Sequence, residues 1–375
     1  MKQISESLEL GSKDGRGRER YSFLTADGVS SKDELRKPEL LLLDETEVSD
    51  DSDVLVVEAN YGVLGILGDY APRGDTTLFT TSDRRRRLIE RNMERNGIDN
   101  SRAVLSADIP DADPDVAVYG PREDTPVDVA KRNVARALDQ MEQGTELYVA
   151  GDKYSGITRM ESFLENSGGK LEKLAQAGGQ RVYRYKNGED VPEEPGVERS
   201  FTAEALGEEA SFRTREGLFS AGELDDGTRL LIESFDGSGK VSVLDLGCGY
   251  GAVSVFLGKK HGLEVTASDD DAVAAKYAER NLEENGVREF KVSNTDCTEG
   301  MDGSFDAVVS NPPTHAGSDI TDEMVSGAYS MLERGGELWM VFNRNVHLEE
   351  KMQEEFGGAE KISGEGNFVV YRSRK

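Results

Sequence analysis

The sequence predicts two α/β domains in tandem, each built around a doubly wound and mostly parallel β-sheet. In both halves of the chain, short apolar runs alternate with helical stretches such as residues 272–284, which is the pattern of parallel strands joined by helices. The second half also repeats the first, and a length of 375 residues suits two or three domains. Each half is therefore expected to bury a core of its own.

The internal repeat holds one constant offset through most of both halves. Its matches include Phe23, Thr25, Gly28, Ser31, Tyr61, Asn92 and Asn96, which recur as Phe212, Thr214, Gly217, Ser220, Tyr250, Asn281 and Asn285. Such a register indicates a duplicated domain. Between the copies, residues 187–208 begin with a stretch rich in acidic residues, Pro and Gly. We expect an acidic linker there, with domains at 1–186 and 209–375.

A cofactor-binding turn is indicated in the second half. There an apolar strand that contains Asp245 runs into Gly247, Cys248, Gly249 and Gly251. Glycine lets the backbone of such a turn approach a ligand closely. Cys248 is interpreted as a small residue tolerated beside that ligand. Dinucleotide-dependent enzymes use similar turns, so the turn alone does not identify the cofactor.

Acidic residues follow the next two predicted strands. Asp269 comes directly after residues 264–268 and is placed to accept both hydroxyls of a ribose. Asp296 follows residues 290–293 and is placed to accept from an adenine amino group, with Cys297 beside it in the same loop. Both features suit NAD as well as other adenosine-containing cofactors.

The run Asn311, Pro312 and Pro313 separates these alternatives. It follows the apolar strand 305–310, downstream of the glycine turn. The Asn carboxamide oxygen is an acceptor, and the prolines fix φ and remove N–H donors, which leaves rigid carbonyl groups. Such a loop can hold an amine nucleophile by its hydrogens, so the sequence favours methyl transfer to an amine.

The chain resembles the class I S-adenosylmethionine-dependent methyltransferases. Within them it is similar to the ribosomal RNA guanine-N2 methyltransferases of the small-subunit methyltransferase C type. That family carries Asn-Pro-Pro-Phe-His-x-Gly, and residues 311–317 read Asn-Pro-Pro-Thr-His-Ala-Gly. Thr314 stands where the family has an aromatic ring thought to stack on the target base. The segments 212–220 and 225–231 resemble the family's stretch before the catalytic core, and the likeness covers about residues 209 to 375.

The resemblance implies two tandem Rossmann-like methyltransferase domains, the first degenerate, and S-adenosylmethionine as cofactor. It implies in-line transfer of a methyl group to the N2 amine of a flipped-out or unpaired guanine in ribosomal RNA, with the RNA of the small subunit as the expected target. The catalytic candidates are Asn311, Pro312, Pro313 and His315. The cofactor-binding candidates are Asp245, Gly247, Cys248, Gly249, Gly251, Asp269, Asp296, Cys297 and Asn311. The substrate-binding candidates are Thr314, Arg215, Phe219, Arg84 and Arg85.

The first copy lacks the chemistry of the second. Glu58 and Asn60 replace the glycines at 247 and 249, and Thr80 replaces the ribose-binding Asp269. After a two-residue slip, residues 120–122 (Gly-Pro-Arg) replace the Asn-Pro-Pro run. We interpret this domain as a fold kept for RNA recognition or as a scaffold.

The formal net charge of −28 is unusual for a protein that binds RNA. High salt would screen the repulsion, since the Debye length falls to about 3 Å at 1 M ionic strength. We therefore hypothesise a halophilic, cytoplasmic protein. No apolar run approaches a membrane span, the N-terminus lacks a signal-peptide core, and two cysteines are too few for a zinc site or a disulfide framework.

The expected partner is ribosomal RNA or a ribosomal subunit, with neither a membrane nor a metal, and the chain is expected to be a monomer because its two copies can satisfy each other's interface. The run of four arginines from Arg84 could contact RNA, or could equally be the solvated face of a helix. Two other functions stay open. One is methylation of a different amine, in large-subunit guanine, adenine or protein glutamine, and the other is a non-catalytic RNA-binding assembly factor.

Overall fold

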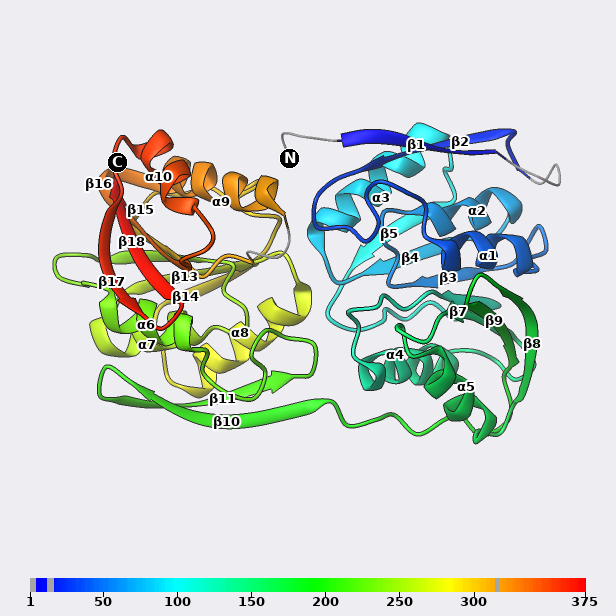
Figure 1. The fold of residues 1–375 in the computed structure, drawn as a ribbon. Helices are drawn as coiled ribbons and strands as arrows, with labels where there is room; N and C mark the ends of the chain where they lie inside the picture. The colour runs from blue at the N-terminus through cyan, green and yellow to red at the C-terminus, as the bar shows by residue number, and fades with distance from the viewer. Residues whose placement is uncertain (1–4, 12–16, 314–316) are drawn as a thin grey trace. The chain divides into compact units, whose positions relative to one another are not determined.

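The computed structural model describes residues 5–11, 17–313 and 317–375. The chain divides into two compact units, one that ends at Val197 and one that runs from Glu198 to Lys375 (Figure 1). Each unit contains one seven-stranded sheet and one two-stranded hairpin. The duplication predicted from the sequence is therefore present in the fold.

The sheet of the second unit has the strand order β14-β13-β12-β15-β16-β18-β17. Its strands are β12 (Ser242–Leu246), β13 (Glu264–Asp269), β14 (Phe290–Asn294), β15 (Phe305–Ser310), β16 (Leu332–Asn343), β17 (Glu360–Glu365) and β18 (Phe368–Arg374). The strands from β14 to β16 are parallel, whereas β18 is antiparallel to both β16 and β17. After β14, at one edge of the sheet, the chain returns to the middle and adds β15 on the other side of β12. The strand order therefore reverses between the neighbours β12 and β15. Ligands of doubly wound sheets bind at the carboxyl ends of the strands at such a point.

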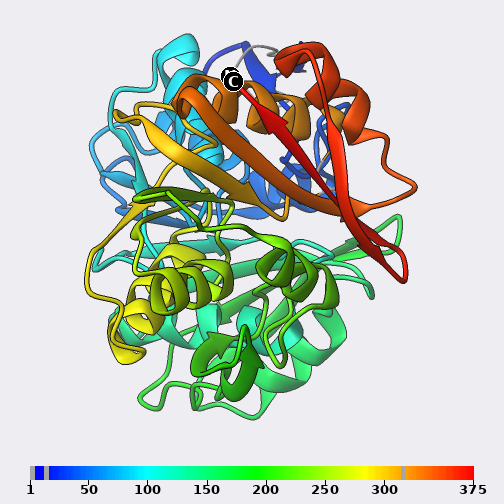
Figure 2. The same ribbon diagram turned by 90° about the vertical axis from the view of Figure 1, so that its left-hand side faces the viewer.

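Helices cover both faces of this sheet (Figure 2). They are α6 (Asp226–Ser234), α7 (Ala252–His261), α8 (Ala272–Glu284), α9 (Ser318–Met331) and α10 (Leu348–Phe356). Helices α6 to α8 pack side by side on one face, while α9 and α10 pack together on the other. Residues 252–258 of α7 are all buried, so this helix is enclosed between the sheet and its neighbours.

The first unit has the same architecture, with the strand order β5-β4-β3-β6-β7-β9-β8. Its strands are β3 (Val54–Val57), β4 (Thr76–Thr80), β5 (Ser101–Leu105), β6 (Val116–Tyr119), β7 (Glu146–Gly151), β8 (Lys170–Ala177) and β9 (Gln180–Lys186). Its helices are α1 (Lys37–Glu45), the short η1 (Val63–Gly65), α2 (Ile66–Tyr70), α3 (Asp83–Asn96), α4 (Val127–Asp139) and α5 (Ile157–Glu165). Both units therefore confirm the predicted doubly wound fold.

A hairpin packs on the helices of each unit and explains part of the sequence repeat. The hairpins are β1 (Ser5–Gly11) with β2 (Arg20–Thr25), and β10 (Glu198–Ala205) with β11 (Glu208–Arg215). Asn281 of α8 and Asn285, which follows the last residue of that helix, hydrogen-bond the backbone of Arg213 and Ser211 in β11. The equivalent residues of the first copy bond β2 in the same way, as Asn92 with Leu24 and Asn96 with Ser22.

The position of β10 corrects the predicted linker. Residues 198–205 were expected to belong to an acidic connection, but they form a strand paired along its whole length with β11. This strand is mostly exposed, with three acidic or basic side chains among its residues, so its composition resembles that of a linker. Within the predicted linker, residues 187–197 have neither helix nor strand, and the boundary between the units lies at the end of this stretch. Among the described residues, no helix is both long enough and apolar enough to cross a membrane.

Candidate active site

The glycine turn after β12 carries three residues in the left-handed region. Gly247, Gly249 and Gly251 have φ of 76°, 54° and 87°. A Cβ on Gly251 would lie 3.0 Å from the Cα of Ala278, so this glycine allows α7 to pack against α8. A Cβ on Gly249 would meet no atom within 4 Å, so its Cα faces open space. Gly251 is thus required for helix packing, whereas Gly249 leaves room for a ligand.

Asp245 fixes the start of the helix that follows this turn. Its Oδ2 accepts hydrogen bonds from the N–H and hydroxyl of Ser254, at 3.0 and 2.7 Å. Burial raises the pKa of Asp245 to about 6, and the hydrogen bonds from Ser254 act in the opposite direction. Its observed contacts are therefore internal, and direct contact with a cofactor stays a prediction.

Asp269 lies against the glycine turn at the end of β13. Its two carboxylate oxygens accept from the N–H groups of Gly249 and Asp271, at 2.8 and 2.9 Å. Each oxygen keeps a second lone pair, which suits a ribose diol. Burial raises the pKa of Asp269 to about 7. The carbonyl of Asp269 accepts from Asn294, which holds the turn in place.

The other predicted cofactor-loop residues, Cys248, Asp296 and Cys297, lie in the loops that follow β12 and β14. Cys248 is buried, and burial raises the pKa of its thiol well above the ordinary value, as do the charges of Asp269 and Asp245. A neutral, buried thiol agrees with a passive role in the loop. Asp296 and Cys297 follow β14. A carboxylate oxygen of Asp296, the Sγ of Cys297 and a carboxylate oxygen of Glu323 all lie within 4.8 Å of one another. The recognition of adenine by Asp296 stays a prediction.

The Asn311 loop begins where β15 ends beside β12. Ser310 donates its hydroxyl to the carbonyl of Leu246 at 2.7 Å and so joins the two strand ends. The side-chain nitrogen of Asn311 donates to the hydroxyl of Thr228 at 2.9 Å and to a carboxylate oxygen of Asp225 at 3.3 Å. Within the described part of the chain, no residue donates a hydrogen bond to its carboxamide oxygen.

The rest of this loop follows directly. Pro312 is buried and Pro313 is exposed, so the first proline anchors the loop and the second faces solvent. The remaining candidates of the loop, Thr314 and His315, lie outside the described residues.

Phe219 is the more exposed of the two described substrate-binding candidates in the second unit, at 64%. It precedes Ser220, whose φ is 49°, in the loop between β11 and α6. The first copy keeps this conformation, since Ser31 has a φ of 57°, but it places Ser30 where the second copy has Phe219. Arg215, in contrast, is buried at the end of β11. At this position of the loop, the structure thus presents an aromatic ring to solvent in the copy that keeps the site motifs and a serine in the other copy.

Arg84 and Arg85 belong to the first unit and therefore lie apart in the chain from the site residues of the second. Arg84 is 4% exposed and donates to the carbonyl of Asp27, and Arg85 donates to the carbonyl of Gly28. The next two arginines, Arg86 and Arg87, pair with Asp83. The run is thus engaged within its own unit. A surface role for Arg84 does not agree with its burial.

The motif positions of the first copy are filled by side chains that bond one another. Glu58 pairs with Arg122 at 3.3 Å, and these residues replace a glycine and a proline of the second copy. Asn60 replaces Gly249, is buried, and bonds both backbone groups of Ser30. Side chains thus occupy the space that is open beside Gly249.

Sequence reasoning missed Asp225 and Thr228 as site residues. The side chain of Asp225 caps α6 by accepting from the N–H of Thr228 at 2.8 Å. An Asp three residues before a Thr at the start of an apolar run is a helix N-cap signal, which could have located the helix. Their contact with Asn311 is tertiary, so nothing in the local pattern indicates it.

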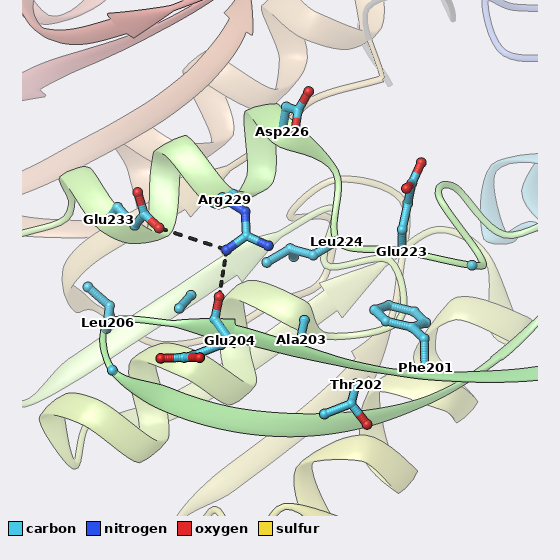
Figure 3. A pocket seen from close by; sticks show the side chains of 13 residues that line it. Phe201, Thr202, Ala203, Glu204, Leu206, Glu223, Leu224, Asp226, Arg229 and Glu233 are labelled. Atoms are coloured by element: carbon cyan, nitrogen blue, oxygen red, sulfur yellow. Dashed lines mark hydrogen bonds and ion pairs between the residues drawn. The ribbon is translucent and has the colours of Figure 1, made fainter.

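A separate pocket of about 710 Å³ lies between α6 and the hairpin β10–β11 (Figure 3). Arg229 crosses it, donating to the carbonyl of Glu204 and lying 3.9 Å from the carboxylate of Glu233. Asp226 also lines this pocket, whereas Asp225 and Thr228 are not among its described lining residues. Helix α6 therefore presents one set of residues to Asn311 and another to the pocket.

Comparison with known proteins connects these features to one group of enzymes. Residues 209–372 match the family model of the methyltransferase small domain. A ribosomal RNA small subunit methyltransferase C from Actinobacillus pleuropneumoniae serotype 7 is 30% identical over 244 residues, covering 63% of this chain and 73% of that protein. The protein of the same name from Escherichia coli strain 55989 is 31% identical over 282 residues, covering 73% of this chain and 80% of that protein.

The likeness to a solved structure extends through both units. The T. thermophilus 16S rRNA N2 G1207 methyltransferase, in complex with AdoMet and guanosine, has a TM-score of 0.82 and 24% identity. The match covers 99% of this chain and 98% of that chain. The tandem fold is thus shared over the whole length.

Proposed function

Because the chain belongs to the ribosomal RNA small subunit methyltransferase C family, we propose that it transfers a methyl group from S-adenosylmethionine to the N2 amine of a guanine in small-subunit ribosomal RNA. The observation that carries this proposal is the Asn311 amide. Its nitrogen is held by Thr228 and Asp225, and its oxygen accepts no hydrogen bond from the described residues. It lies at the end of β15, beside the strand that enters the glycine turn.

The residues around the glycine turn suit the cofactor. Gly249 leaves open space, and Asp269 offers two acceptor oxygens beside it for a ribose diol. We assign Gly247, Gly249 and Asp269 to cofactor binding, with Gly251 allowing the packing of α7 on α8. When bound, S-adenosylmethionine would supply a methyl group on a sulfonium: as an amine attacks that carbon, the methyl–sulfur bond breaks, neutral S-adenosylhomocysteine leaves and the methylated amine loses one proton.

Asn311 and Pro312 would then orient the amine. The lone pair of an exocyclic guanine amine is delocalised into the ring, which makes it a weak nucleophile. If the Asn311 oxygen and the Pro312 carbonyl accept its two hydrogens, the nitrogen is favoured to become pyramidal and its lone pair is directed away from the loop. Positioning and electrostatics supply this catalysis, without a covalent intermediate.

The target base must leave its stack to reach such a loop, since the N2 amine of a paired guanine is enclosed by the helix. Phe219 is our candidate for a ring that supports the unstacked base, because it is exposed in the loop before α6. Stacking on an aromatic ring contributes about 1–3 kcal/mol per base. We propose that the first unit serves as scaffold or RNA-binding surface.

The partner is proposed to be ribosomal RNA or a ribosomal subunit, and the protein a cytoplasmic monomer. The net charge of −28 supports activity at high salt, where repulsion between the protein and RNA is screened. Recognition would then depend on shape, hydrogen bonds and stacking more than on counterion release.

Transfer of labelled methyl from S-adenosylmethionine to unmodified small-subunit RNA, and to subunits, tests the proposal at molar KCl. The product nucleoside is then identified. We expect N2-methylguanosine with the wild type and at least about 100-fold less with Asn311→Ala, in line with the loss of one catalytic hydrogen-bonding group. A different modified nucleoside would refute the acceptor, and cofactor binding without transfer would support a binding-only protein.

A further inference from the structure

We propose that Asp225 and Thr228 are positioning residues that determine which atom of the Asn311 carboxamide faces the acceptor amine. This inference rests on the function proposed above, because it concerns the same amide. It adds the N-cap residue Asp225 and the first-turn residue Thr228 of α6, 86 and 83 positions from Asn311 in the chain, to the set that controls the reaction.

Three hydrogen bonds converge on one carboxylate oxygen. The Oδ2 of Asp225 accepts from the N–H of Thr228 at 2.8 Å, from its hydroxyl at 3.2 Å and from the Asn311 nitrogen at 3.3 Å. The hydroxyl oxygen of Thr228 also accepts from that nitrogen at 2.9 Å. Thr228 is buried, and Asp225 and Asn311 are half-buried. The nitrogen of the Asn311 amide therefore faces two acceptors at the start of α6.

The chemistry of a carboxylate makes this arrangement directional. An ionised Asp225 can only accept hydrogen bonds, and the Thr228 hydroxyl, which donates to it, has only lone pairs left for Asn311. The group of Asn311 that faces them must be the NH₂. The carboxamide oxygen then points away and can accept from a substrate amine. If the amide turned over, its oxygen would face the two acceptor oxygens of Asp225 and Thr228. Its NH₂ would then face the substrate amine, which is also a donor, and methyl transfer would lose its acceptor.

The same contacts would also strengthen the acceptor. Donation by an amide N–H polarises the group and increases the negative charge on its oxygen, as in other hydrogen-bonded chains. Asp225 thus acts on the substrate amine through Asn311 without touching it.

In the first copy, the hydrogen bonds between the corresponding helix and loop run in the opposite direction, from a donor on the helix to acceptors in the loop. Arg36 and Glu39 stand at the positions of Asp225 and Thr228, and Gly120 stands at that of Asn311. There the link runs the other way, since Arg36 donates to the carbonyls of Gly120 and Pro121 at 3.1 and 2.9 Å. The copy without an amide has a donor on the helix, and the copy with the amide has an acceptor.

Steady-state kinetics of the full chain can test the assignment. Asn caps a helix about as well as Asp, so Asp225→Asn keeps the cap but removes the acceptor-only group. We expect its kcat to fall at least tenfold, with the KM for RNA and the Kd for S-adenosylmethionine within twofold of wild type. Thr228→Val, which removes the hydroxyl, should lower kcat in the same way. Thr228→Ser, which keeps the hydroxyl, should leave kcat near the wild-type value.

Asp226→Asn is the matched control, because it makes the same change of charge one position along, on an exposed residue at the start of α6 that is among the residues lining the pocket (Figure 3). Its kcat should stay within twofold of wild type. In an Asn311→Ala background, Asp225→Asn should lower the residual rate no further. Equal kcat values for the Asp225 and Asp226 variants, or a full additional loss in the Asn311→Ala background, would overturn the assignment.

A second readout does not depend on RNA. In NMR spectra of the protein alone, the Asn311 side-chain amide protons should exchange slowly with water in the wild type and in Asp226→Asn, and faster in Asp225→Asn. Unchanged exchange in Asp225→Asn would refute the positioning role even if the protein methylates RNA. Absence of methyl transfer by a wild type with protected amide protons would count against the proposed function alone.

Discussion

Asn281 donates its side-chain amide to the carbonyl oxygen of Tyr250 at 2.8 Å and thereby joins helix α8 to the glycine turn. The same side chain also bonds both backbone groups of Arg213 in β11. A single buried residue thus holds the hairpin and the turn in register.

We expect Asn281→Ala to lower the free energy of unfolding by about 1–3 kcal/mol, because it leaves buried backbone groups without partners. Urea unfolding measures this change. Asn285→Ala is the control, since Asn285 is only half-buried and bonds β11 and its own helix. Equal effects of the two substitutions would contradict the special position of Asn281.

The affinity for S-adenosylmethionine should decrease as the pH is lowered through about 7, the pKa of the buried Asp269. Burial raises this pKa, so the protein without cofactor holds the proton up to that pH, and the ionised form that accepts from both ribose hydroxyls predominates only above it. Calorimetric titration between pH 6 and 8 should show up to about a tenfold loss per unit below the pKa. In Asp269→Asn, the affinity should be weak and nearly independent of pH. A wild-type profile as flat as that of the variant would remove Asp269 from the ribose site.

The glycines at 249 and 251 should respond to Ala in opposite ways. A Cβ at 249 meets no atom within 4 Å, so Gly249→Ala should cost only about 1–2 kcal/mol of stability for its left-handed φ but should weaken cofactor binding at least tenfold. At 251 a Cβ would lie 3.0 Å from the Cα of Ala278, so Gly251→Ala should mainly destabilise the fold. Thermal unfolding and calorimetry on both variants separate the effects. Normal cofactor affinity in Gly249→Ala would show that this glycine does not face the ligand.

Stability should rise with KCl. Raising the concentration from about 0.1 to 1 M shortens the Debye length from about 10 to 3 Å, which screens the repulsion within a chain of net charge −28. The midpoint of thermal unfolding should increase by more than about 5 °C, which corresponds to a few kcal/mol for a protein of this size. A neutral osmolyte at equal osmolality controls for exclusion of solute. A midpoint independent of KCl would refute the halophilic hypothesis.

Motifs whose function depends on the backbone could be located from the sequence. Gly249, Asp269 and Asn311 follow strands, and parallel strands bring their carboxyl ends together, so the pattern alone predicted their proximity. Asp225 could not be assigned in this way, because its contact with Asn311 joins residues 86 positions apart. Arg84 was misleading for a related reason, since a run of four charges suggests a surface while the turn of the helix directs this side chain inward.

Strand β10 shows a further limit of composition. Its side chains are mostly exposed, because the hairpin lies on the outside of α7 and α8 and its strands are covered on one side only. Such a strand needs few apolar residues. Its hydrogen bonds to β11 define it, and those depend on a partner strand and not on its own hydrophobicity.

The ion pairs of the first copy also bear on how the two halves could have diverged. Returning Glu58 to Gly would leave the guanidinium of Arg122 with Asp124 as its one remaining ion-pair partner among the described residues. Replacing Arg122 first would remove this ion-pair partner of Glu58, a residue with a positive φ. Arg36, which bonds the backbone of Gly120, presents the same obstacle to restoring an amide there. Each single reversion would remove an ion pair or a hydrogen bond before any chemistry returned. A change from these residues back to the motif of the second half would therefore require several substitutions together, because each residue is bound to another of the set.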